Sequence, residues 1–275
     1  MNSKRVDVSV IVPCFRCVDS LDRAIKSVLA QTELPKELIL VDDASGDGTL
    51  MALYSWRDRF PDFIRVLALS VNQGAGVARN AGWSLAEGDY VAFLDSDDSW
   101  HPKKLAIQYA FMKSHPGVAL SGHGHVIGLA LTGDLTMDSL SVDNLRWWRL
   151  LVKNPFVTPS AMVRRDVVPR FLINRRYMED HLLWMELALS GGQVVRLNLP
   201  LAILHKAQVG VAGLSSHVFA MSRADLGNYW QLYRRGLLGL PLLLLCWGWG
   251  SIKFFRRVVI LGISSAWQKR KAWRD

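Results

Sequence analysis

The stretch Tyr90–Trp100 reads YVAFLDSDDSW and joins a short apolar run to three carboxylates within four residues. The run from Tyr90 to Leu94 is typical of a buried strand. Carboxylates this close repel one another and are costly to hold together without a positive partner. The stretch therefore predicts a strand that ends at a ligand site.

The first 115 residues repeat this arrangement of a short apolar run followed by polar residues. Apolar residues at helical spacing separate the runs, which is typical of βαβ units and predicts an α/β fold with a mainly parallel sheet flanked by helices. The predicted strands are 8–13, 38–41, 64–69 and 90–94, and the predicted helices are 21–30 (capped by Asp19 or Ser20), 49–56, 76–85 and 102–113.

Polar or turn-forming residues follow each predicted strand. Ligands of parallel sheets bind beyond the carboxyl ends of the strands, so these residues predict a nucleotide site at one edge of the sheet. They are Pro13 to Phe15 after the first strand, Asp42 and Asp43 after the second, Asn72 to Arg79 after the third, and Asp95 to Asp98 after the fourth.

A divalent cation would relieve the crowding of Asp95, Asp97 and Asp98. Mg²⁺ and Mn²⁺ prefer carboxylate oxygens and commonly bridge substrate phosphates, so a diphosphate would complete the ligand set. The structural alternative is that Asp97, Asp98 or Ser99 caps a helix beginning near Pro102. One acid is enough for a cap, and capping does not explain three.

Asp42 and Asp43 open a second polar segment, and their carboxylates could accept hydrogen bonds from a base or from ribose hydroxyls. The alternative is a turn rich in Asp, Gly and Ser. The loop Asn72–Gly76 precedes a helix that carries Arg79, and it could approach a phosphate or a base closely. It matches neither the P-loop nor the dinucleotide-binding glycine pattern.

The middle of the chain is less regular, and it predicts both strands and helices. A helix over 177–190 ends at Gly191 and Gly192, and aromatic residues at helical spacing are expected to pack in the core, with stacking on acceptor sugars as the alternative for Trp147, Trp148 and Trp184. The other predicted elements are strands 118–130, 156–163 and 194–203, and an amphipathic helix 138–153.

Positive charge is concentrated at the C-terminal end. Residues 234–275 hold nine Lys or Arg and one acid, so eight of the nine net positive charges lie there. Without a basic face on the main domain, a nucleic-acid partner is not expected. The uncharged run 236–252 is short for a spanning helix, but its basic and tryptophan flanks favour a membrane surface over a buried core helix.

The chain shows no signal peptide, so a cytoplasmic start is expected. Its cysteines, Cys14, Cys17 and Cys246, are too few for a disulfide framework. The pair Cys14 and Cys17 has the spacing of a redox or zinc motif, but no second ligand pair accompanies it. Two small residues in a loop between a strand and a helix are the simpler interpretation.

Five segments follow one another over residues 6–115: VSVIVPCF, SVLAQT, LILVDDASGDGT, NQGAGVARNAG and GDYVAFLDSDDSWHPKKL. In order and spacing they resemble glycosyltransferase family 2. The resemblance implies the Rossmann-like GT-A fold and transfer of a sugar, with inversion, from a nucleotide diphosphate sugar. It also implies Mn²⁺ or Mg²⁺ as cofactor, and UDP is the expected nucleotide.

The resemblance also implies roles for residues at the strand ends. Asp97 would be the main metal ligand, with Asp95 and Asp98 assisting, and Pro13 and Asp43 would line the nucleoside pocket with Asp42 beside them. The remaining residues expected around the nucleotide sugar are Phe15, Asn72, Gly74, Arg79 and Ser96.

Family members carry an acidic pair at the start of a later helix, and Glu179 with Asp180 matches it. Asp180 would be the general base that deprotonates the acceptor hydroxyl, although acids also favour a helix N-terminus by charge alone. His181 is expected to pack rather than to catalyse. A loop over 206–217 would close over the nucleotide, with Lys206 and Ser215, beside His205 and Ser216, near the diphosphate.

We therefore expect a metal-dependent glycosyltransferase that acts on a hydroxyl of a saccharide or lipid-linked saccharide in surface polysaccharide synthesis. The expected parts are a nucleotide-sugar half (1–115), an acceptor half with the base (116–216) and a helical tail (217–275). Residues 234–275 would hold the enzyme on the cytoplasmic face of the plasma membrane, peripherally or as a re-entrant segment. The alternatives are a polyprenyl-phosphate sugar synthase and a catalytically silent membrane scaffold that binds nucleotide.

Overall fold

The computed structural model describes residues 4–128, 135–136, 139–173, 175–205 and 214–271. By contacts along the chain, it divides into two compact units, Met1–Ala207 and Gln208–Asp275. Within the first unit one sheet runs across the predicted boundary at residue 115.

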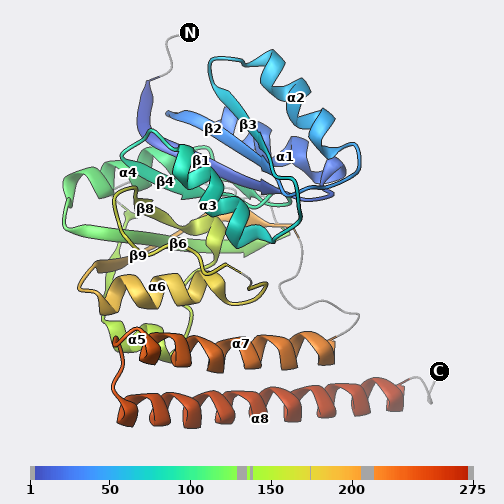
Figure 1. Ribbon diagram of the computed structural model, residues 1–275, viewed down its shortest axis with the longest axis vertical. Helices are drawn as coiled ribbons and strands as arrows, with labels where there is room; N and C mark the ends of the chain where they lie inside the picture. The colour runs from blue at the N-terminus through green and yellow to red at the C-terminus, as the bar shows by residue number, and fades with distance from the viewer. Residues whose placement is uncertain (1–3, 129–134, 137–138, 174, 206–213, 272–275) are drawn as a thin grey trace. The chain divides into compact units, whose positions relative to one another are not determined.

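The first part of the sheet is parallel, as the alternation of strands and helices predicts (Figure 1). The apolar runs form its buried centre, and all four predicted strands are present within a few residues of the expected ends. In spatial order they are β3 (Ile64–Ala68), β2 (Leu34–Asp42), β1 (Arg5–Cys14) and β4 (Tyr90–Phe93).

The second part of the sheet is mixed. Beyond β4 the order is β8, β6, β9 and β5, and β7 pairs with β9; β6 and β9 are parallel, whereas the other pairs are antiparallel. The bounds are β5 (Ser99–Trp100), β6 (Val118–Ile127), β7 (Val142–Leu145), β8 (Met162–Arg164) and β9 (Gln193–Leu204).

Helices cover both faces of the sheet. Alternate β1 residues Val8, Val10 and Val12 share a core with one set of helices, and Ile11 faces α3 on the other side, as the period of two in a strand requires. The bounds are α1 (Val18–Leu29), α2 (Thr49–Arg59), α3 (Ala75–Leu85), α4 (Lys104–Ser114) and α6 (Glu179–Leu189).

The predicted helix caps and the predicted helix 138–153 are wrong in part. Cys17, rather than Asp19 or Ser20, caps α1, and it does so without a side-chain hydrogen bond. Within 138–153 the described residues form β7 and a short helix, α5 (Trp147–Val152). The antiparallel pairing of β7 with β9 overrides the local helical pattern, because it satisfies backbone groups that a helix would otherwise pair internally.

The predicted strand 156–163 is shorter than expected. Pro159 lies in a 3-10 turn, η2 (Thr158–Ser160), and only the residues after this turn join the sheet as β8. Proline has no N–H to donate to a strand partner, which explains the late start. Of the three tryptophans expected in the core, Trp184 is fully buried, whereas Trp147 and Trp148 are exposed.

The second unit consists of two helices that pack side by side, α7 (Leu214–Arg234) and α8 (Leu240–Lys271) (Figure 1). Gly236, with φ +73°, lies in the turn between them. A partly buried ion pair joins the helices, with 2.6 Å between Lys253 Nζ and Asp225 Oδ2. Over the described residues, neither helix combines the length and the hydropathy that crossing a bilayer requires.

Candidate active site

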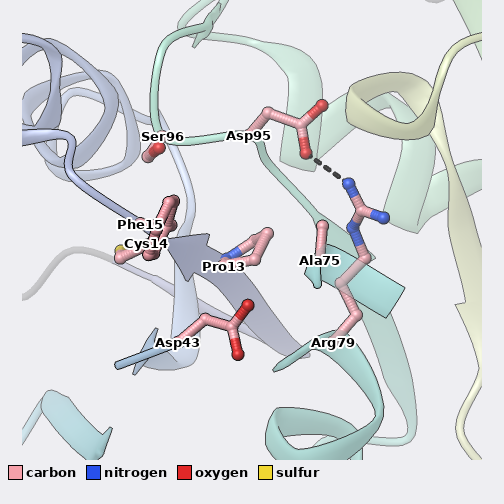
Figure 2. Close-up of a pocket in the computed structure, with 8 residues that line it drawn as sticks. All are labelled: Pro13, Cys14, Phe15, Asp43, Ala75, Arg79, Asp95 and Ser96. Carbon is pink, nitrogen blue, oxygen red and sulfur yellow. Dashed lines mark hydrogen bonds and ion pairs between the residues drawn. The ribbon is translucent and has the colours of Figure 1, made fainter. Parts of the chain in front are cut away.

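A pocket of about 270 Å³ opens beyond the carboxyl ends of β1, β2 and β4 (Figure 2). The parallel register aligns Cys14 at the end of β1 with Asp42 at the end of β2, so the residues that follow both strands reach one place. Six residues that the sequence singles out lie together here. The lining residues are Pro13, Cys14, Phe15, Asp43, Ala75, Arg79, Asp95 and Ser96.

Asp43 shapes one wall of the pocket by holding the loop before α3. Its carboxylate accepts the backbone N–H groups of Gln73 and Gly74, with N–O distances of 2.9 and 2.7 Å. The amide of Asn72 donates to the Asp43 carbonyl at 3.0 Å. Gly74 has φ +93°, a conformation that favours glycine. The predicted loop and the predicted carboxylate therefore form one structure.

The carboxylate of Asp42 points into the turn that follows β2. Its carboxylate accepts hydrogen bonds from the hydroxyl and the backbone N–H of Ser45, with distances of 2.5 and 3.3 Å. It is absent from the pocket lining given above. Its observed contacts are therefore those of a turn residue, and a role beside the nucleoside stays a prediction.

The carboxylates of the opening stretch do not cap α4. The residue before that helix is Lys103, and no side-chain cap is present. Asp95 faces Arg79, while the backbone carbonyl of Asp97 accepts a hydrogen bond from Arg23 at 2.6 Å. Asp98 accepts the backbone N–H of His205 at 3.2 Å. The alternative in which Asp97, Asp98 or Ser99 caps the helix is therefore wrong.

Asp98 is a buried carboxyl held close to two other negative charges. Burial, reinforced by the negative charges of Asp95 and Asp97, raises the pKa of Asp98 to about 7. A divalent cation would reverse this effect, so the donor chemistry fits Mn²⁺ or Mg²⁺. Within the part of the chain that the structure describes, no three His, Cys, Asp or Glu side chains form a complete ion site. Oxygen atoms of a nucleotide would have to complete the ligand set.

Arg79 links the two acidic segments that the sequence singles out. Its Nη2 lies 2.7 Å from Asp95 Oδ1, and its Nη1 lies 3.3 Å from Glu179 Oε1. Burial by itself would lower the pKa of the guanidinium, but the charges of Asp95 and Glu179 outweigh it and raise the pKa. Segments about 80 residues apart in the sequence therefore meet at one buried cation.

The acidic pair opens α6, as the sequence predicts. Asp180 Oδ2 accepts hydrogen bonds from Asn154 Nδ2 at 3.2 Å and Thr158 Oγ1 at 3.3 Å, and Oδ1 accepts the His181 backbone N–H at 2.7 Å. Burial raises the pKa of Asp180 against the opposing effect of these donors and of Arg79. A carboxylate with a raised pKa is a better proton acceptor near neutral pH.

The ring of His181 is buried and lies 2.6 Å from the Leu150 carbonyl, which agrees with the expected packing role. His205 contacts Ser99 through its Nε2, at 2.8 Å. Lys206 lies outside the described residues. The backbone of Ser215 belongs to the first turn of α7 and its side chain is not described. Their predicted contacts with a diphosphate stay predictions.

Several contacts of the site have no sequence signal. Asn154 and Thr158, which bind Asp180, lie in an irregular segment without a motif, and Phe171 lies under the guanidinium of Arg79 at 5.3 Å from its ring centroid. Cys14 and Ala75 line the pocket through their places at the end of β1 and the start of α3. Asn154, Thr158 and Phe171 are identified only by their spatial neighbours, whereas Cys14 and Ala75 lie within the strand-end segments that the sequence predicts.

The sheet, the pocket at its strand ends and the acid-bearing helix α6 define an α/β enzyme of the GT-A type. The family model described as glycosyl transferase family 2 matches residues 9–169, which is more than half of the chain. The chain therefore belongs to glycosyltransferase family 2 and is a glycosyltransferase. This result does not support the alternative of a catalytically silent membrane scaffold that binds nucleotide.

The chain is similar to several curated bacterial proteins. It is 45% identical to the teichuronic acid biosynthesis glycosyltransferase TuaG of Bacillus subtilis, over 38% of this chain but only 41% of TuaG. It is 32% identical to the glycosyltransferase EpsE of Bacillus subtilis, over 86% of this chain and 84% of EpsE. It is 26% identical to an Escherichia coli glucosyltransferase, WfgD, over 82% of this chain and 84% of WfgD. The name of WfgD gives UDP-Glc and a GlcNAc-diphosphoundecaprenol as its substrates.

Solved structures agree on the fold. The Staphylococcus aureus protein TarS in complex with UDP-GlcNAc matches with a TM-score of 0.62 and 22% identity, over 81% of this chain and 66% of that structure. The mannosyltransferase PcManGT of Pyrobaculum calidifontis, in complex with GDP-Man and Mn²⁺, matches with a TM-score of 0.64 and 17% identity. The match covers 99% of this chain and 83% of that structure.

Proposed function

We propose that this enzyme transfers a sugar, with inversion, from a nucleotide diphosphate sugar to a hydroxyl of a saccharide or lipid-linked saccharide during synthesis of a bacterial surface polysaccharide. The observation that carries the proposal is the buried link from Asp95 through Arg79 to Glu179. It supports a single site in which the acids after β4 and the acids of α6 act on the same substrates.

The donor would enter the pocket beyond the ends of β1 and β2. Pro13, Phe15 and Asp43 line the wall where the nucleoside would lie, and Asp95 and Ser96 line the side nearer the diphosphate. UDP is the proposed nucleotide, in keeping with the donor in the name of WfgD and the ligand in the TarS structure.

Asp97, with Asp98, would hold the divalent cation together with oxygens of the diphosphate. When bound, such an ion offsets the charge that develops on the departing diphosphate. The structure of PcManGT contains Mn²⁺, which is in keeping with a divalent cation in this proposal.

Asp180 would accept the proton of the acceptor hydroxyl while the hydroxyl oxygen attacks the sugar carbon opposite the diphosphate. Asn154 and Thr158 fix the direction of this carboxylate by hydrogen bonds to Oδ2. A base acts only when ionised, so turnover should fall as the pH falls through the raised pKa of Asp180. General bases contribute about 10²–10⁴-fold to rate.

The acceptor would be presented by a membrane. Several apolar side chains of α8 are exposed, including Leu245 and Phe255, and basic residues are concentrated over 234–275. Such a surface suits the anionic cytoplasmic leaflet, where each Lys or Arg contributes about 1 kcal/mol. The names of TuaG and WfgD support a surface glycan or a lipid diphosphate as the acceptor.

The test is nucleotide release from a panel of UDP- and GDP-sugars, with Mn²⁺ and membrane lipid supplied. We expect release with one donor, lost on addition of EDTA and reduced at least 100-fold in Asp97→Ala, because cation binding would fail. A wild-type enzyme that releases nucleotide equally well in EDTA would contradict the cation assignment.

A polyprenyl-phosphate acceptor remains the second candidate, and Asp180→Asn separates it from the first. A phosphate needs little deprotonation, whereas a hydroxyl needs a base. We expect a loss of 100-fold or more in kcat for Asp180→Asn with nucleotide affinity unchanged. A loss below 10-fold would favour the phosphate acceptor.

A further inference from the structure

Arg79 is placed to join elements rather than only to face a ligand. It extends from α3, and its side chain is only 5% exposed. One arm of the guanidinium reaches Asp95 after β4, and the other reaches Glu179 at the start of α6 (the first pair is the dashed line in Figure 2). Phe171 covers it from a third segment.

These contacts would be costly to give up. Removing one partner from a buried ion pair leaves an uncompensated charge, which is strongly destabilising. Turning the guanidinium wholly toward a phosphate would leave the buried carboxylate of Glu179 without its cation and would also release the partly exposed Asp95. The planar fork of arginine suits two partners at once, which a lysine ammonium does not match.

We infer that Arg79 is a positioning residue that couples the donor side of the site to the base side, by fixing Asp95 and Glu179 through one guanidinium. The inference rests on the proposed function and extends it. Asp180 follows Glu179 directly at the start of α6, so holding Glu179 also holds the first turn that presents the base.

Arg79 affects the proposed base, Asp180, through its positive charge as well as through its position. The groups facing Asp180 are the neutral donors of Asn154 and Thr158, the His181 backbone N–H, the cation of Arg79 and the neighbouring carboxylate of Glu179. Glu179 faces Arg79, Asp180 and Asp95. In both carboxyls, burial raises the pKa and Arg79 opposes it, so Arg79 helps to keep the acidic pair ionised.

The experiment compares Arg79→Gln and Arg79→Lys with wild type in the full chain, by calorimetric UDP affinity, kcat and the pH profile of kcat. For Arg79→Gln we expect UDP affinity within about 3-fold of wild type, a kcat at least 100-fold lower, and an acid limb shifted to higher pH. Arg79→Lys should restore the acid limb but not the full kcat. A large loss of UDP affinity with kcat kept at saturation, or an unchanged acid limb, would overturn the inference.

A second readout does not depend on finding the donor. Thermal unfolding of wild type and Arg79→Gln is compared between pH 5 and pH 8. Without the guanidinium the acidic pair is tolerated when protonated and repels when ionised, so the loss in Tm should grow with pH. An equal loss in Tm at pH 5 and pH 8 would overturn the inference that Arg79 couples the two sides of the site. If the wild-type enzyme transferred no sugar, that result would count only against the proposed function.

Glu179→Gln, with Arg79 intact, provides a second variant in case Arg79→Gln fails to fold. It should show the same fall in kcat while its UDP affinity stays unchanged. An unchanged kcat would overturn the inference.

Discussion

At the residue scale, Asp98 is a buried carboxyl that lies close to two like charges. It is 6% exposed, and two further carboxylates lie in the same four-residue stretch. The folded chain therefore holds a carboxyl whose pKa is about 7, against 3.8 for an ordinary aspartate. Such a group destabilises the fold when ionised, which a structural role alone would not require.

The sign of this effect gives a stability prediction. The folded chain holds the proton more tightly than the unfolded chain, so stability should fall as the pH rises from about 4 to 7 and then level off. Asp98→Asn removes the penalty and should be more stable than wild type by about 2–4 kcal/mol at pH 8 in EDTA, with little difference at pH 4. Urea unfolding at the two pH values measures it.

Asp62→Asn, at an exposed carboxylate, serves as the matched control. Its effect should be small and similar at both pH values. Equal effects of Asp98→Asn at pH 4 and pH 8 would contradict the account of a repelled buried carboxylate.

Cys17 supplies a second residue-scale prediction. A hydrogen bond from Cys14 lowers the pKa of the Cys17 thiol to about 7, despite burial. The rate at which iodoacetamide alkylates Cys17, followed by mass spectrometry, should therefore increase with pH, with a midpoint near pH 7. Cys14→Ala removes the hydrogen bond and should move the midpoint toward 9. Cys246, whose pKa burial raises, provides an internal comparison. An unchanged midpoint in Cys14→Ala would contradict the interpretation that Cys14 lowers the pKa of Cys17.

At the scale of elements, the close packing of α3 on the sheet positions the site. A Cβ atom at Gly82 would lie 2.7 Å from Ile11 Cγ2 and 3.2 Å from Val41 Cγ2. Only glycine lets the helix approach β1 and β2 this closely. The same helix carries Ala75 and Arg79 into the pocket, so its distance from the sheet sets the geometry of the site.

Gly82→Ala should therefore reduce both stability and activity. Overpacking of this kind costs about 1–3 kcal/mol, and the displaced helix would shift Arg79 from Asp95. Chemical denaturation and kcat measure the two effects. Ser84→Ala, on an exposed position of the same helix, is the control and should be nearly neutral. Unchanged stability in Gly82→Ala would mean that Ile11 can yield without moving α3.

At the scale of the whole molecule, the second unit differs from the first in its surface. Leu245 and Phe255 are 70% and 66% exposed on α8, whereas the sheet unit buries most of its apolar side chains in cores. Exposed apolar side chains beside basic residues are typical of helices that lie in a membrane interface. Binding to a membrane would then need no spanning segment.

Vesicle sedimentation of the full chain tests this surface. We expect binding to phosphatidylglycerol vesicles that weakens with salt, little binding to phosphatidylcholine, and at least 10-fold weaker binding for Leu245→Glu with Phe255→Glu. Met51→Glu, at an exposed position on α2, should bind like wild type. Equal binding by the α8 variant would rule this surface out.

The sequence by itself determined the parallel half of the sheet, the order of its helices, and the residues that gather at the strand ends. Apolar periodicity is local, and parallel strands end at one edge, so residues such as Asp43 and Asp95 could be placed without coordinates. Tertiary structure alone decided that β7 replaces a predicted helix and that Asn154 and Thr158 hold Asp180. These outcomes depend on partners distant in sequence, and burial of Arg79 between two acids is a property that no local pattern encodes.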